Sequence, residues 1–81
     1  MIITVVIPCY NVAKHIKDVI CNIPDSVSYI IAVNDCSKDE TESILLNLAN
    51  ENKKIIYIRH EVNQGVGAAM ISGYYVGNMI H

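Results

Sequence analysis

Three apolar runs recur along the chain at one spacing. They begin near Ile3, Tyr29 and Ile55, so successive starts lie 26 residues apart. That interval is long enough for a strand, a helix and two turns, and it is longer than a hairpin requires. The repeat therefore predicts an α/β fold, a Rossmann-like βαβαβα unit with a sheet of three parallel strands. With only 81 residues, the chain forms one domain at most.

A short polar segment follows each apolar run. These segments extend from Ile7 to Asn11, from Val33 to Asp39 and from Arg59 to Gly67. In an open parallel sheet every strand delivers its following loop to the same edge, where ligands bind outside the carboxyl ends. We therefore expect the three polar segments to converge on one site.

The residues between the strands have helical periodicity. Apolar residues from Val12 to Ile23 recur at helical spacing, with Asn11 as the expected N-cap, and Pro8 should end the first strand because it cannot donate to a ladder. Residues 37–40 have capping-box spacing ahead of a second amphipathic stripe. The third helix, from Val66, contains three glycines that each cost roughly 1 kcal/mol relative to alanine. Their place on or beside the apolar stripe favours close packing of this helix on the sheet.

Composition excludes several classes of function. The net charge is −2 and no run of Lys or Arg could neutralise the phosphates of a nucleic acid. No apolar stretch approaches the ~20 residues that cross a bilayer, and the first residues lack the features of a secretory signal. We therefore expect a cytoplasmic protein. Cys9, Cys21 and Cys36 have no CxxC spacing, which favours reduced, mostly buried thiols over disulfides or zinc.

Several residues in the polar segments could bind a nucleotide. Asp35 can accept a hydrogen bond from a ribose hydroxyl or a base N–H, or it can cap a helix. Tyr10 can stack on a base, or it can be an ordinary half-buried tyrosine. The backbone around Gly65 suits an anion such as a diphosphate. His15 and His60 are expected to be solvated surface residues, although a positive charge at Arg59 or His60 could meet phosphate.

Other nucleotide-binding and catalytic motifs are missing. A dinucleotide fold requires glycines directly after the first strand, where this chain has Pro8 and Tyr10. No Gly-Lys-Ser or Gly-Lys-Thr of a Walker loop occurs, and no Gly-x-Ser-x-Gly elbow of an esterase. A fragment of a nicotinamide-dependent oxidoreductase is therefore the third hypothesis. Tight binding of a dinucleotide would favour it.

Taken together, three segments resemble the inverting family-2 glycosyltransferases of the GT-A fold, especially those that load sugars onto polyprenyl phosphate. The segments are residues 5–11, 31–41 and 63–69, and the likeness covers essentially the whole chain. The resemblance implies strand order 3-2-1 and a nucleotide-sugar donor, either UDP- or GDP-linked. It implies a nucleotide pocket formed by Pro8, Tyr10, Asn11, Val33, Asp35 and Gly65. Two positions depart from the family pattern, Val12 in place of Glu and Asn34 in place of the first acid.

The resemblance also implies a divalent metal, Mg or Mn, held by an Asp-x-Asp motif after a fourth strand. The chain stops at His81 before such a motif, so we expect residues 1–81 to be a single nucleotide-binding domain fragment with no metal site and no catalytic residue of its own. We expect the parent protein to be the enzyme. Whether it associates with a membrane is left open by these residues. The alternative is a non-catalytic nucleotide-binding or scaffold module. Because the first strand would lie at an open sheet edge, we also predict a homo-oligomer joined through residues 2–7.

Overall fold

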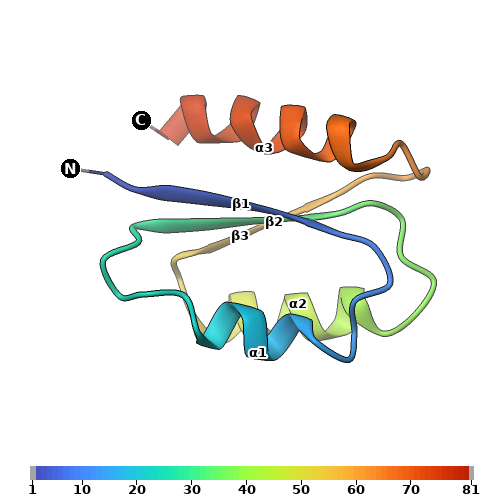
Figure 1. Cartoon of the computed structure of the whole chain (residues 1–81), viewed down its shortest axis with the longest axis horizontal. Coiled ribbons are helices and arrows are strands. Elements are labelled where there is room, and N and C mark those ends of the chain that lie inside the picture. The colour runs from blue at the N-terminus through green and yellow to red at the C-terminus, as the bar shows by residue number, and fades with distance from the viewer. Residues whose placement is uncertain (1, 81) are drawn as a thin grey trace.

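The computed structural model describes residues 2–80 and contains three strands and three helices in strict alternation (Figure 1). In chain order these are β1 (Thr4–Cys9), α1 (Ile16–Cys21), β2 (Tyr29–Asn34), α2 (Thr41–Glu51), β3 (Ile55–Arg59) and α3 (Val66–Ile80). All strands are parallel in the order β1-β2-β3, with Thr4 opposite Tyr29 and Ile30 opposite Ile55. The predicted fold class and strand order are confirmed.

The sheet lies between two helical layers. Figure 1 shows α1 and α2 covering one face and α3 the other. On the first face, eight buried residues form a core that includes Cys9, Ala32 and Leu45. On the second face, Ile31, Val33 and Ala69 are buried together. Residues of β2 therefore alternate between two cores, as expected for a strand covered on both sides.

Pro8 does not end the first strand as predicted. It lies within β1 opposite Val33, and the strand continues to Cys9. The carbonyl of Cys9 accepts a hydrogen bond from the Asp35 N–H (N···O 2.8 Å), so the backbone of Cys9 faces β2. Alternation turns the backbone of Pro8 to the outer side of this edge strand, where a missing N–H interrupts no ladder.

Both predicted helix caps are wrong, because tertiary contacts use the capping groups. Helix α1 begins only at Ile16, whereas Asn11 lies in a turn with φ of 52°. Helix α2 begins at Thr41 with no capping side chain at Glu40. In place of the capping box, Asp39 accepts hydrogen bonds from the backbone N–H and the hydroxyl of Thr41.

The glycines of α3 have different environments. A Cβ at Gly73 would overlap Val6 of β1, and one at Gly77 would touch Ile31 at 3.6 Å, so the predicted close packing is confirmed at these two positions. Gly67 has nothing within 4 Å of such an atom and packs against no neighbour. The missing side chain at Gly73 allows the backbone of α3 to approach the sheet closely.

Three free thiols occur, as expected, but only one is buried. Cys9 is buried, Cys36 is half-buried and Cys21 is exposed. Burial raises the pKa of Cys9 to about 11, so this side chain stays a neutral thiol. Among residues 2–80, no helix combines the length and the hydropathy that a membrane span requires.

Candidate functional site

The first and second polar loops are joined at the carboxyl edge of the sheet. The backbone N–H of Asn11 donates to Ser37 Oγ (3.0 Å), and Asn11 Oδ1 accepts from the Lys38 N–H (2.8 Å). The next two residues continue the contact, since the Val12 N–H donates to Thr41 Oγ1 and the Ala13 N–H to Asp39 Oδ2. Side chains of the second loop thus fix the backbone of the first.

Asp35 joins the second loop to the third. Its Oδ1 accepts the Gln64 N–H (2.8 Å), and its Oδ2 accepts the Gly65 N–H (2.7 Å). Cys36 adds a weak contact from its thiol to the carbonyl of Glu61. The predicted convergence of all three polar segments is confirmed, with Asp35 at its centre.

Each loop turns at one residue of positive φ. These residues are Asn11 at 52°, Cys36 at 60° and Gly65 at 91°. Asparagine tolerates the left-handed region of positive φ and glycine adopts it freely, whereas for cysteine this conformation costs about 1 kcal/mol or more. The strained residue directly follows Asp35, so the turn at Cys36 is held by the contacts that surround the carboxylate.

His60 is buried, which corrects the expectation of a solvated surface residue. It is 7% exposed, and its Nδ1 lies 2.8 Å from Asp35 Oδ1. Its Nε2 lies 2.8 Å from Ser72 Oγ of α3. His15 is exposed, as predicted. The alternation of residues along the strand could have indicated that His60 is buried. Ile56 and Ile58 face α3, and the next residue in that alternation is His60.

The carboxylate of Asp35 is ionised at neutral pH. The Gln64 N–H, together with His60 and the Gly65 N–H, lowers its pKa below the ordinary range, and desolvation opposes them. The pKa of Asp39 is also lowered, first by its bond to the Thr41 hydroxyl. Both carboxylates therefore act as hydrogen-bond acceptors that hold loops together.

Asn34, the neighbour of Asp35, belongs to a second network on the face of α2. Its Oδ1 accepts from the Ser37 N–H, and its Nδ2 donates to the Tyr57 hydroxyl (3.0 Å). Tyr57 in turn donates to Glu42 Oε2 (3.1 Å), which also pairs with Arg59 Nε (3.3 Å). Burial first, and then Glu42, raises the pKa of Tyr57, so its hydroxyl remains a donor.

The predicted nucleotide-binding residues lie at this edge with different accessibility. Tyr10 is 43% exposed and Asn11 is exposed, whereas Pro8 and Gly65 are half-buried. Val33 is fully buried, so neither its side chain nor its backbone is exposed. The polar network also includes His60, Ser72 and Tyr57, which were not predicted as part of it.

The described residues do not fit a divalent cation. Within residues 2–80, no three His, Cys, Asp or Glu side chains lie close enough together to hold one. The carboxylates of Asp35 and Asp39 are already bonded to backbone N–H groups of their own loops. Each of these carboxylates is thus partly occupied by structural hydrogen bonds, and within residues 2–80 no group of three such side chains supplies the several oxygen ligands that Mg²⁺ or Ca²⁺ requires.

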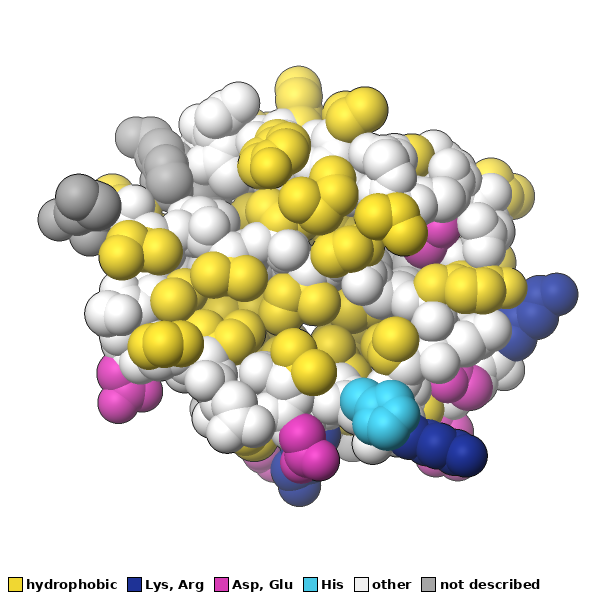
Figure 2. Space-filling view, viewed as in Figure 1, with side chains coloured by type: hydrophobic (Ala, Val, Ile, Leu, Met, Phe, Trp, Pro, Cys, Tyr) yellow, Lys and Arg dark blue, Asp and Glu magenta, His cyan; other side chains and the backbone are white. Residues whose placement is uncertain are grey.

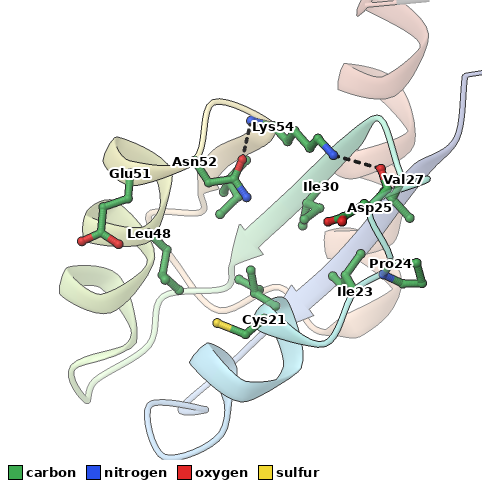
Figure 3. Close-up of a pocket in the computed structure, with 12 residues that line it drawn as sticks. Cys21, Ile23, Pro24, Asp25, Val27, Ile30, Leu48, Glu51, Asn52 and Lys54 are labelled. Carbon is green, nitrogen blue, oxygen red and sulfur yellow. Dashed lines mark hydrogen bonds between the residues drawn. The ribbon is translucent and has the colours of Figure 1, made fainter.

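A cavity of about 400 Å³ lies at the opposite, amino-terminal edge of the sheet (Figure 3). Ile30 and Leu48 form part of its apolar wall, and Cys21 borders it from α1. Lys54 donates to the carbonyl of Asp25 at its rim (3.0 Å), as Figure 3 shows. None of the residues predicted to bind the nucleotide lines this cavity.

Comparison with known proteins identifies the family. The model of glycosyl transferase family 2 matches residues 4–75. A UDP-N-acetylglucosamine–dolichyl-phosphate N-acetylglucosaminyltransferase of Methanococcus voltae is 40% identical over 89% of this chain, and a dolichyl-phosphate beta-glucosyltransferase of Trichomonas vaginalis is 31% identical over 88%. An uncharacterized glycosyltransferase of Rickettsia prowazekii is 39% identical over 89%. The chain spans 34%, 25% and 22% of the length of these curated relatives. With the parallel sheet and the convergent loops, these matches show that the chain belongs to glycosyl transferase family 2.

Proposed function

We propose that this chain is the nucleotide-sugar-binding portion of a glycosyltransferase. In the parent protein, an acceptor would displace the nucleoside diphosphate of a UDP- or GDP-sugar with inversion. An acceptor such as polyprenyl phosphate is supported by two relatives whose names specify dolichyl phosphate. The observation that carries the proposal is the convergence of the three polar loops in a chain of this family.

The pocket would be formed by Pro8, Tyr10, Asn11, Val33, Asp35 and Gly65. The half-exposed ring of Tyr10 is available for stacking on a base. Within residues 2–80, Asp35 Oδ2 accepts a single hydrogen bond, from the Gly65 N–H. Because a carboxylate oxygen has two acceptor positions, one would remain for a base N–H. The start of α3 directly after Gly65 suits a diphosphate.

A divalent metal, Mg or Mn, would neutralise the leaving diphosphate in the parent enzyme. Because the described carboxylates do not fit such an ion, we assign its ligands to other residues of the parent. The chain itself would then bind nucleotide without a metal. A non-catalytic nucleotide-binding module would have the same property, and turnover by the parent protein distinguishes the two.

Calorimetric titration of this chain with UDP and with GDP tests the proposal. We expect saturable binding of at least one nucleotide, unchanged by EDTA. Tyr10→Ala should weaken binding roughly tenfold, because stacking on one aromatic ring contributes about 1–3 kcal/mol. Tyr74→Ala is the matched control, since this tyrosine on α3 is 61% exposed and lies outside the pocket. Binding of neither nucleotide by folded protein would refute the proposal.

We also propose that the edge of β1 joins two copies of the chain. Ile2 is 53% exposed and Ile3 38%, and a cavity of about 300 Å³ lies between β1 and α3. Figure 2 shows hydrophobic side chains gathered on this face. Sedimentation should detect a dimer that Ile2→Lys dissociates, and a stable monomer at high concentration would exclude it.

A further inference from the structure

We infer that His60 and Ser72 are positioning residues for Asp35. This inference rests on the proposed nucleotide site and assigns a role to a chain of hydrogen bonds within it, which is buried at Asp35 and His60 and partly buried at Ser72. The chain runs from Ser72 Oγ through the two ring nitrogens of His60 to Asp35 Oδ1, with both distances at 2.8 Å. It connects α3 to the end of β2 across the third loop.

The two oxygens of Asp35 differ in their remaining capacity. Oδ1 accepts from Gln64 and contacts His60, which fills both of its acceptor positions. Among the described residues, Oδ2 has the Gly65 N–H as its single partner. The contact with His60 therefore fixes the rotation of the carboxylate and leaves its one remaining acceptor on Oδ2.

The charge of Asp35 determines the proton positions on His60. Because the lowered pKa keeps Asp35 ionised, it can only accept, so Nδ1 of His60 carries a proton. Nε2 shares a hydrogen bond with the Ser72 hydroxyl, which can donate to a neutral ring or accept from a protonated one. Asp35 and His60 are 4% and 7% exposed, so solvent has little access to replace a lost partner.

Ser72 reaches His60 because α3 lies close to the sheet. The next residue is Gly73, where any side chain would overlap Val6. Ala69 and Val76, three and four residues away on the same helix, pack in the core on this face. The position of Ser72 is thus set by packing of the whole helix, and the histidine transfers that position to the carboxylate.

The test changes the serine, because removing His60 would leave a buried carboxylate without a partner and threaten the fold. Ser72→Ala removes one hydrogen bond, and we expect the affinity for UDP or GDP to fall about 2- to 10-fold. Ser72→Thr keeps the hydroxyl and should bind within about twofold of the unmodified chain. Ser43→Ala is the matched control, since that hydroxyl donates to the carbonyl of Glu40, the residue before α2, and does not contact His60.

Nitrogen-15 spectra of the His60 ring report whether loss of the serine changes the bond between His60 and Asp35. The unmodified chain should show a protonated Nδ1, and Ser72→Ala should shift the Nδ1 signal as well as that of Nε2. An Ala variant that is folded and binds as well as the original would overturn the positioning role and leave the proposed function intact. Equal weakening by Ser43→Ala, or a Thr variant as weak as the Ala variant, would also overturn it. If the folded original binds neither nucleotide, the proposed function fails and this inference fails with it.

Discussion

The two faces of the sheet end in polar networks built from adjacent residues but different in burial. On the side of α2, Asn34 leads through Tyr57 to Glu42 and Arg59, whose side chains are 40% and 47% exposed. On the side of α3, Asp35 and His60 are almost completely buried. Successive residues of a strand point to opposite faces. The amide of Asn34 therefore lies in the solvent-facing network, and the carboxylate of the next residue, Asp35, lies in the enclosed one.

This difference bears on the family resemblance, which implies an acid at both positions. An amide at Asn34 can both accept from Ser37 and donate to Tyr57. A carboxylate there could not donate, and it would compete with Glu42 for the one proton of the Tyr57 hydroxyl. The substitution of Asn for an acid therefore fits the second network, while Asp35 retains its charge among backbone donors.

The largest effect is expected where α3 meets the sheet. Gly73→Ala places a Cβ against Val6, and such overpacking should lower the free energy of unfolding by about 1–3 kcal/mol. Gly67→Ala is the control in the same helix, and should raise it by about 0.5–1 kcal/mol, because nothing lies within 4 Å and alanine favours the helix. Urea unfolding of both variants measures the difference. Equal stability would mean that α3 does not pack as closely as described.

A smaller effect is expected from the Asn34 network. Tyr57→Phe removes the acceptor of the Asn34 amide, which is 1% exposed, and should cost about 1 kcal/mol of stability. Glu42 loses the same hydroxyl but can bond water. Chemical denaturation measures the loss, and Tyr29→Phe serves as a control outside this network. A neutral result would show that another group satisfies the amide.

The contribution of the Asp35 network to stability should decrease in acid, whereas that of the Asn34 amide should not change. The folded-state pKa values of Asp35 and Asp39 lie below that of an unfolded aspartate, about 3.9. Their contribution to stability is therefore complete above that pH and is lost as the pH falls through the folded values. Unfolding midpoints measured at decreasing pH should fall for the original chain and less steeply for Asp35→Asn. Parallel curves would contradict the role of this carboxylate.

The sequence predicted the architecture better than the polar contacts, for a physical reason. Apolar periodicity predicted the elements and the edge where the loops meet, since burial of apolar faces dominates the fold, and the family resemblance implied the strand order. The site depends on pairs distant in sequence: His60 is 25 residues from Asp35, and Asn11 is 27 from Lys38. Local rules placed Asn11 at a helix cap and His60 in solvent because they could not include these partners.

The smallest effect is expected at the exposed end of the Asn34 network. Arg59 and Glu42 form an ion pair at 3.3 Å, but both side chains are nearly half exposed. Water screens such pairs, which contribute about 0–1 kcal/mol. Arg59→Gln should therefore change the unfolding midpoint very little, and added salt should remove the remaining difference. A large, salt-resistant loss would mean that Arg59 supports Tyr57 through the ion pair, and the network facing α2 would then resemble the enclosed one around Asp35.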